Sequence, residues 1–301
     1  MASPGGAAAP SEAWWSAAPP GFDGPPAAER ESVRIGPGAV RLDLTEGVRT
    51  RWPPRSQHGK PACVAFATAA CVELMLAHAT GTDPRRLSPM FVYSLVRSRK
   101  SEPLPGGWDT GATKLRQAAE VLERDGIPPE DAWPIARDAA TPPDEAAVAA
   151  AAALLRRRLL YEDFPEPRPA PVGIARRIHA ELVAGRPVAI ALPEFADPER
   201  DGPTDWHTEW VVRTGEVTDP APWARPRRGI GHAICIVGFQ PAEHEALGGY
   251  FLFRNSWGTP WASTAPNGDA ADAPFVPAPG YGTISASHVE AHCWELLSLA
   301  P

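Results

Sequence analysis

The stretch that decides the fold is residues 57–66, which read Gln-His-Gly-Lys-Pro-Ala-Cys-Val-Ala-Phe. Apolar residues recur at helical spacing from Cys63 to Leu74, so the pattern predicts a helix over residues 61–78 that ends at Gly81. A thiol is nucleophilic only as the thiolate, and the partial positive charge of a helix N-terminus favours that form. The position of Cys63 at the start of this helix therefore makes it a candidate nucleophile.

Two apolar segments far along the chain supply the partners that a nucleophilic thiol needs. Residues 231–238 form a strand-like run that contains His232, and residues 249–254 form a second run that leads into Asn255. A polar amide at the end of a buried strand, followed by Trp257, is costly unless it has a partner. Orienting an imidazole ring is one such partnership. We therefore predict that His232 takes the thiol proton and that Asn255 orients its ring.

These motifs together resemble those of the papain family of cysteine peptidases. In that family a Gln lies six residues before the catalytic Cys, and here Gln57 has that spacing to Cys63. The strand over residues 231–238 is similar to the family's histidine strand, and Asn255–Trp261 resembles its asparagine motif almost letter for letter. The likeness keeps the family's order over roughly residues 40–298. It implies an α+β, papain-like two-lobed fold, with a helical lobe followed by a β-barrel-like lobe and the active-site cleft between them.

The resemblance also implies a role for each matched residue. Cys63 would be the nucleophile, His232 would form a thiolate–imidazolium pair with it, and Asn255 would hold the imidazole. Gln57 and the main-chain N–H of Cys63 would form the oxyanion hole. The residues expected to bind substrate are Gly106, Gly107, Gly231, Trp257 and Trp261. Of the two tryptophans, the first is expected to shield the histidine–asparagine bond and the second to line the leaving-group side.

The sequence departs from the family pattern at four positions. Lys60 and Leu104 stand where many members have the two cysteines of a disulfide, so both partners are absent together. Val64 replaces the Trp that usually follows the nucleophile. His58 replaces the Gly that usually follows the oxyanion Gln, and it either perturbs the hole or replaces a backbone feature. The missing disulfide favours an intracellular protein, and no inhibitory propeptide is recognised.

Composition narrows the classes of partner. The 301 residues carry a formal net charge of −7 without long basic runs, which argues against nucleic-acid binding. Apolar windows such as residues 146–155 are too short to span a bilayer, and no secretory signal is recognised. With only four cysteines, we expect a cytoplasmic protein without cofactor or metal. Its expected partners are a peptide or protein substrate and a regulatory protein, with no membrane.

Composition also changes along the chain. Residues 1–32, rich in Ala, Pro and Gly, are expected to form a flexible tail. Residues 33–301 are expected to form the peptidase domain, with a helical lobe over about 57–184 and a β lobe over about 185–301. Helices are predicted over residues 61–78, 88–96, 113–124, 144–160 and 174–184. Strands are predicted over residues 187–192, 232–239, 250–254 and 281–285.

Other residues receive plainer interpretations. Cys71, Cys235 and Cys293 are expected to be buried apolar residues. A zinc site at His288, His292 and Cys293 lacks a fourth ligand of fitting spacing. Trp206 and His207 are expected on a polar surface loop. The expected function is hydrolysis of peptide bonds through a thioester. The alternatives are an amidase or acyl transferase on the same fold, and a silent peptide-binding scaffold.

Overall fold

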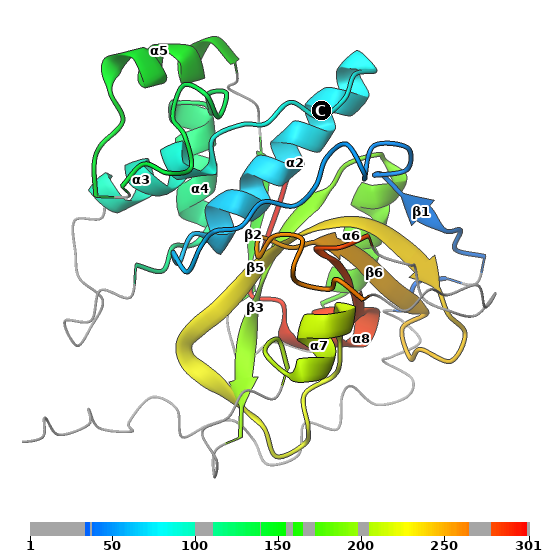
Figure 1. The fold of residues 1–301 in the computed structure, drawn as a ribbon. Coiled ribbons are helices and arrows are strands. Elements are labelled where there is room, and N and C mark those ends of the chain that lie inside the picture. The colour runs from blue at the N-terminus through cyan, green and yellow to red at the C-terminus, as the bar shows by residue number, and fades with distance from the viewer. Residues whose placement is uncertain are drawn as a thin grey trace, which may run out of the picture.

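The computed structural model describes residues 34–36, 38–99, 111–138, 140–154, 159–164, 172–197, 205–264 and 278–299. The helices are α2 (Cys63–Thr80), α3 (Pro89–Arg99), α4 (Leu115–Arg124), α5 (Glu145–Leu154), α6 (Ile174–Val183), α7 (Glu209–Thr214) and α8 (Ala286–His292). The strands are β1 (Leu42–Asp43), β2 (Leu159–Asp163), β3 (Val188–Ala196), β4 (Glu216–Val217), β5 (Arg225–Pro241), β6 (Gly249–Arg254), β7 (Tyr281–Ser285) and β8 (Glu295–Leu299). Helices dominate the first half and strands the second, which confirms the predicted α+β, two-lobed fold (Figure 1).

The strands form one eight-stranded sheet in the order β2-β8-β3-β5-β6-β7-β4, with β1 paired to β5. The long strand β5 lies between β3 and β6, and its side chains alternate between the two faces of the sheet. Ala233, Cys235 and Val237 pack in the cluster that contains α2. Ile234 and Ile236 pack on the other side, with α6 and α8. The sheet is therefore covered on both faces, and α2 lies directly against β5 (Figure 1).

Helix α2 is the core helix of the molecule. It ends at Gly81, whose φ of +66° is the left-handed conformation that glycine adopts without steric cost. Within the described residues, α2 is also the one helix long and apolar enough to cross a membrane, which the sequence prediction overlooked. However, 67% of that stretch is buried inside the protein. Burial against β5 and α3 explains why this helix is apolar on nearly every side.

Most of the predicted elements are confirmed, with bounds that differ by a few residues. In α3, the Ser88 hydroxyl accepts the main-chain N–H of Phe91 at 3.0 Å, so Ser88 caps this helix as predicted. The cysteines expected in the core, Cys71, Cys235 and Cys293, are all buried. The first two lie on α2 and β5 with their sulfur atoms 3.4 Å apart. The predicted tail over residues 1–32 lies outside the described residues.

One predicted helix is too long. The pattern predicted a helix over residues 144–160, but α5 ends at Leu154 and residues 159–163 form β2. The reason is long-range pairing, because β2 lies antiparallel to β8 near the C-terminus. Helix α6 also packs with the sheet, in the cluster that contains α8. Strand β2 and helix α6 thus pack with the sheet although they precede the predicted lobe boundary near residue 184, and that boundary stays a prediction.

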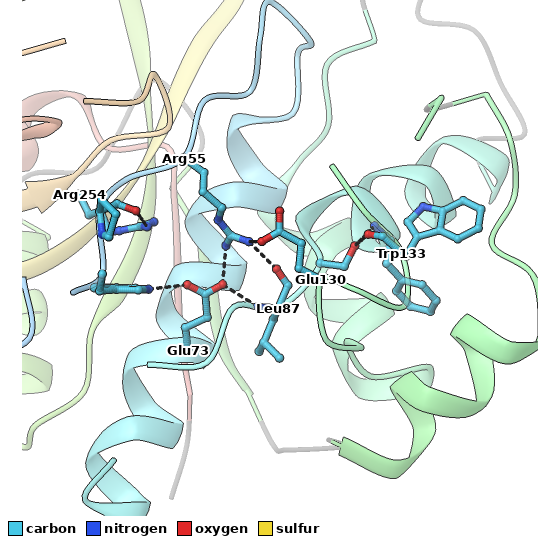
Figure 2. Close-up of polar contacts among 10 residues, drawn as sticks. Arg55, Glu73, Leu87, Glu130, Trp133 and Arg254 are labelled. Atoms are coloured by element: carbon cyan, nitrogen blue, oxygen red, sulfur yellow. Dashed lines mark hydrogen bonds and ion pairs between the residues drawn. The ribbon is translucent and has the colours of Figure 1, made fainter. Parts of the chain in front are cut away.

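A buried network of charges joins the two halves of the molecule (Figure 2). Arg55 pairs with Glu73 of α2 and with Glu130 at 2.7 Å, and it donates to the carbonyl of Leu87 at 2.7 Å. The side chains of Arg55 and Glu73 are only 5% and 0% exposed. Burial at this level demands partners, because an isolated buried charge is strongly destabilising.

Arg254 extends this buried region to the end of β6. Its guanidinium lies over the ring of Trp52 at 4.1 Å from the centroid and donates to the carbonyl of Pro53 at 2.9 Å. The indole N–H of Trp52 in turn donates to Glu73 at 2.7 Å. Burial lowers the pKa of Arg254, while the Glu73 carboxylate opposes that shift. Because Arg254 directly precedes Asn255, this packing fixes the backbone that carries the predicted catalytic amide.

Candidate active site

Cys63 is the first residue of α2 and remains partly exposed, whereas the other three cysteines are buried. The N–H groups of a helix's first turn have no partner within the helix, and they point toward this end. The main-chain N–H groups of Ala233 and Val64 act on the sulfur and lower the pKa of the Cys63 thiol. Burial acts more strongly in the opposite direction, so the net pKa is raised. The thiol therefore lies beside the residue that follows His232.

Asn255 holds the ring of His232 in one tautomer. The Asn255 side-chain oxygen accepts the main-chain N–H of Ser256 at 2.7 Å, which identifies that atom as the oxygen. The same oxygen lies 2.7 Å from Nε2 of His232. An amide oxygen only accepts hydrogen bonds, so Nε2 of His232 must carry the proton. The other ring nitrogen, Nδ1, is then unprotonated in the neutral ring and can accept a proton.

Aromatic rings enclose His232, which is 3% exposed. The ring of Trp257 lies 4.5 Å from it, tilted by 33°, which places this tryptophan where the sequence predicted a shield. Trp206 contacts it edge-on at 5.0 Å. Trp261 is 4% exposed and packs behind Trp257 at 5.8 Å, so it supports that ring rather than lining a leaving-group surface as predicted.

The prediction that Trp206 and His207 lie on a polar surface loop is half wrong. Trp206 is fully buried against His232, and His207 stacks on Trp257 at 4.9 Å with an interplanar angle of 23°. The local sequence is polar, and polarity alone indicates a solvated loop. The contacts arise instead from tertiary packing, because β5 and the residues after β6 come from elsewhere in the chain.

Burial disfavours the charged form of both groups of the candidate pair. It lowers the pKa of His232 to about 4, although the hydrogen bond to Asn255 and the charge of Glu194 raise it. It raises the pKa of Cys63, as described above. Burial therefore opposes the thiolate–imidazolium pair that the resemblance implied, and that pair stays a prediction.

Gln57 is fixed beside the helix start by three hydrogen bonds. Its main-chain N–H donates to the carbonyl of Ser256 at 2.8 Å, and its side-chain oxygen accepts the Ser256 hydroxyl at 2.6 Å. Its Nε2 donates to the carbonyl of Lys60 at 2.6 Å. Because a side-chain amide has two N–H groups, one remains for a developing oxyanion. This geometry is compatible with the predicted oxyanion role, together with the main-chain N–H of Cys63.

The backbone of His58 shows what the replacement of the family's glycine does at this position. Its φ is +48°, in the left-handed region that glycine enters freely and other residues enter at a cost. The chain therefore keeps the backbone conformation that a glycine would allow, and the exposed imidazole is turned away from the core. The substitution retains the turn between Gln57 and Gly59 rather than removing it.

The predicted substrate-binding glycines have different outcomes. Gly106 and Gly107 lie outside the described residues. Gly231 pairs with Pro193 in the sheet, and a Cβ there would lie 2.5 Å from the Trp294 ring and 2.6 Å from the Leu192 carbonyl. Close packing therefore requires glycine at this position, whether or not substrate contacts it. Its predicted role in binding substrate stays a prediction.

The sequence analysis did not identify a charged cluster near His232, formed by Glu194, His207 and Arg227. Glu194 lies on β3, with its side chain 9% exposed, and its Oε2 is 3.3 Å from Nε2 of His207. Arg227 donates to the same oxygen at 3.2 Å. The charge of Glu194 raises the pKa of both His232 and Cys63, which places it near the candidate pair. The sequence did contain one sign of this cluster. Glu194 is a carboxylate within an apolar strand pattern, and a buried carboxylate needs a partner.

The described residues contain no cluster of three or more His, Cys, Asp or Glu side chains arranged to hold a metal ion. The groups gathered at this site are the thiol, the imidazole, the amides and the charged cluster. Each of these groups is placed by a different element, and the sheet brings them together.

No protein-family model and no curated protein matches the sequence. Xylellain, a cysteine protease from Xylella fastidiosa, superposes with a TM-score of 0.61 at 18% identity, covering 89% of this chain and 88% of its own. Digestive procathepsin L 3 of Tenebrio molitor larval midgut gives 0.54 at 16% identity, covering 89% and 71%. The bromelain protease from Ananas comosus, in complex with the E64 inhibitor, gives 0.53 at 17%, covering 86% and 98%.

These likenesses establish the class of the fold. The chain has the two-lobed fold of papain-like cysteine proteases, as the sequence motifs predicted. Identities of 16–18% concern the fold alone, so the activity has to rest on the geometry of this chain's own residues.

Proposed function

We propose that this protein is a cysteine peptidase that hydrolyses peptide bonds through a thioester on Cys63. The observation that carries the proposal is the hydrogen bonding of Asn255, which leaves Nδ1 of His232 free to accept a proton. The thiol lies at the main chain of Ala233, directly after that histidine. A nucleophile, a base and an orienting group thus come from α2, β5 and the end of β6, which is the arrangement that covalent catalysis requires.

The proposed reaction has two stages. Nδ1 of His232 takes the proton of the Cys63 thiol as the sulfur attacks the carbonyl carbon of the peptide bond. The resulting oxyanion accepts hydrogen bonds from the main-chain N–H of Cys63 and the side-chain amide of Gln57. The imidazolium then protonates the leaving amine, and a thioester remains. Water, deprotonated by His232, hydrolyses the thioester and restores the thiol.

The decisive experiment is labelling with an epoxysuccinyl thiol inhibitor of the E64 type, with the modified residue located by mass spectrometry. We expect fast modification confined to Cys63, because the other cysteines are buried. The His232→Ala variant should react at least about 100-fold more slowly, which is the usual contribution of a general base. Casein or a peptide library then provides the test of turnover.

The alternatives are separated by the same experiment. Labelling of the His232→Ala variant at the rate of the unchanged protein would contradict an activated pair and favour a silent peptide-binding scaffold. Fast labelling without cleavage of any peptide would favour an amidase or acyl transferase on this fold. A cytoplasmic location and a regulatory protein partner stay predictions.

A further inference from the structure

An irregularity in the sheet places a charged cluster beside the candidate pair. On β3 and β5, Pro193 pairs with Gly231 and Phe195 pairs with Pro226. The single residue between them on β3, Glu194, therefore faces residues 227–230 of β5. A bulge of this kind redirects side chains, and bulges are common next to active sites. Here Arg227 donates to the carboxylate of Glu194 at 3.2 Å, on the same strand that carries His232.

The two cations of this cluster face solvent, and its carboxylate does not. The side chains of His207 and Arg227 are 42% and 37% exposed, whereas that of Glu194 is 9% exposed. Oε2 of Glu194 already accepts from both cations. With His207 protonated, the three formal charges of +1, +1 and −1 give a net charge of +1. An incoming group therefore meets positive charge, with the negative charge engaged beneath it.

Asp205 also acts on His207, but it is fully buried, so the exposed side chains of the cluster remain the two cations. Glu194 and Asp205 raise the pKa of His207, while burial and Arg227 lower it, with a net rise above the ordinary value. Asp205 is itself fully buried, accepts the main-chain N–H of Phe195 at 3.0 Å, and has a pKa raised by burial. His207 is therefore protonated more readily than an ordinary histidine.

The position of the cluster relates it to the leaving half of a substrate. The leaving amine must pass beside the ring of His232, because that ring protonates it. Trp257 packs on the ring, and His207 stacks on Trp257. The Cys63 sulfur lies instead at Ala233, further along β5 and away from Arg227. The acyl half stays with the sulfur, so the half that departs meets His207 and Arg227.

We propose that His207 and Arg227, held by Glu194, form a subsite that binds a carboxylate on the leaving half of the substrate. This inference rests on the proposed peptidase function and gives it a specificity. The carboxylate can come from an acidic side chain directly after the scissile bond or from a free peptide C-terminus. In both cases the guanidinium and the imidazolium supply charge-assisted hydrogen bonds.

The test is a set of peptides with a randomised acyl half and Asp, Asn or Lys after the scissile bond, all with amidated ends. Mass spectrometry of the products gives kcat/KM for each. We expect Asp over Lys by about tenfold, since partly exposed charge pairs contribute up to about fivefold each. A fourth peptide, with Asn and a free C-terminus, identifies the source of the carboxylate. Equal rates for all four peptides would overturn the proposal.

Variants connect the preference to the cluster. Arg227→Gln should reduce the Asp-to-Lys ratio to about two. Arg225→Gln is the matched control on the same strand, because Arg225 is exposed and bonds the neighbouring carbonyl of Ala224 at 3.2 Å. It should retain the ratio. The preference of the unchanged protein should also weaken as pH rises through the raised pKa of His207, because the imidazolium loses its proton. An unchanged ratio in Arg227→Gln would contradict the assignment.

Failure of peptidase activity is kept distinct from failure of this subsite. Binding of fluorescent Asp and Lys peptides to the Cys63→Ala variant, measured by anisotropy, needs no turnover. Tighter binding of the Asp peptide, lost in the Cys63→Ala/Arg227→Gln double variant, would support the subsite even if no peptide is cut. Equal binding of the two peptides, or no binding of either, would overturn it.

Discussion

His232 shows how strongly the surroundings of one side chain govern its chemistry. Enclosure by Trp257 and Trp206 removes water from the ring and lowers its pKa to about 4. The same burial raises the pKa of the Cys63 thiol. Proton transfer between the two groups creates both charges together, so each charge then stabilises the other. A bound substrate that places its carbonyl between them benefits from this dry environment.

A pH profile of Cys63 reactivity tests whether burial keeps this thiol protonated near neutral pH. The thiolate exists above the pKa of the thiol, and that pKa is raised, so its population should grow only in the alkaline range. The rate of Cys63 alkylation by iodoacetamide should therefore rise steeply above about pH 8.5, the ordinary value for cysteine. Mass spectrometry of quenched samples gives the rate. A level, fast rate from pH 5 to 8 would reveal a preformed ion pair instead.

At this scale the sequence predicted the central residues and missed their neighbours. Cys63, His232 and Asn255 each lie at a recognisable break in a local pattern, where a helix begins or a strand contains a polar residue. Glu194 also breaks an apolar strand pattern, but its partners depend on a bulge, and the contacts of Trp206 depend on a loop packed against another strand.

Strand β7 begins directly after a turn at Gly280, and only glycine fits this turn. Gly280 has a φ of +84°, and a Cβ there would lie 2.7 Å from Cγ of Pro54 and 2.9 Å from the carbonyl of Gly258. Its own carbonyl accepts the main-chain N–H of Asn255 at 3.0 Å. The start of β7 thus supports the backbone of the orienting amide across the sheet.

Gly280→Ala should therefore destabilise the protein by about 2–4 kcal/mol, from the left-handed backbone and the overlap together. Urea unfolding measures this change, and E64-type labelling should slow in the folded fraction. Gly185→Ala is the matched control, because Gly185 has a φ of +74° with nothing within 4 Å of the added Cβ. It should cost only about 1 kcal/mol. Equal losses in the two variants would contradict the packing argument.

At the scale of helices and strands, long-range pairing can override a local sequence pattern. The alanine-rich run predicted one helix to residue 160, yet β2 forms over Leu159–Asp163 because β8 provides an edge for it. Backbone hydrogen bonds along a sheet edge outweigh the modest helix propensity of a few residues. Since β8 lies more than a hundred residues later, no local window contains this information.

At the scale of the whole molecule, the buried ion network ties α2 to the end of β6. Glu73 receives hydrogen bonds from Arg55, from the indole of Trp52 and from the main chain of Leu87 at 2.8 Å. Arg254 packs over the ring of Trp52. The network therefore couples the helix that carries Cys63 to the strand that leads into Asn255 (Figure 2).

Glu73→Gln should reduce stability by about 3 kcal/mol, because the buried guanidinium of Arg55 loses its charged partner while the shape is retained. Denaturant unfolding measures the loss. Glu120→Gln is the control, since its pair with Arg116 is exposed at 60% and 69%. That variant should change stability by less than about 0.5 kcal/mol. A loss in Glu73→Gln no larger than in the control would show that the network is dispensable.

The sequence by itself determined the local elements and the three candidate residues within or beside them. Helix α2, strand β5 and strand β6 follow from short-range periodicity, and Cys63, His232 and Asn255 stand out against it. Only the tertiary structure decided what surrounds them. The bulge that brings Arg227 to Glu194, the burial of Trp206 and the pairing of β2 with β8 all join segments far apart in sequence. The physical reason is that burial and charge pairing depend on distance in space, which local patterns do not encode.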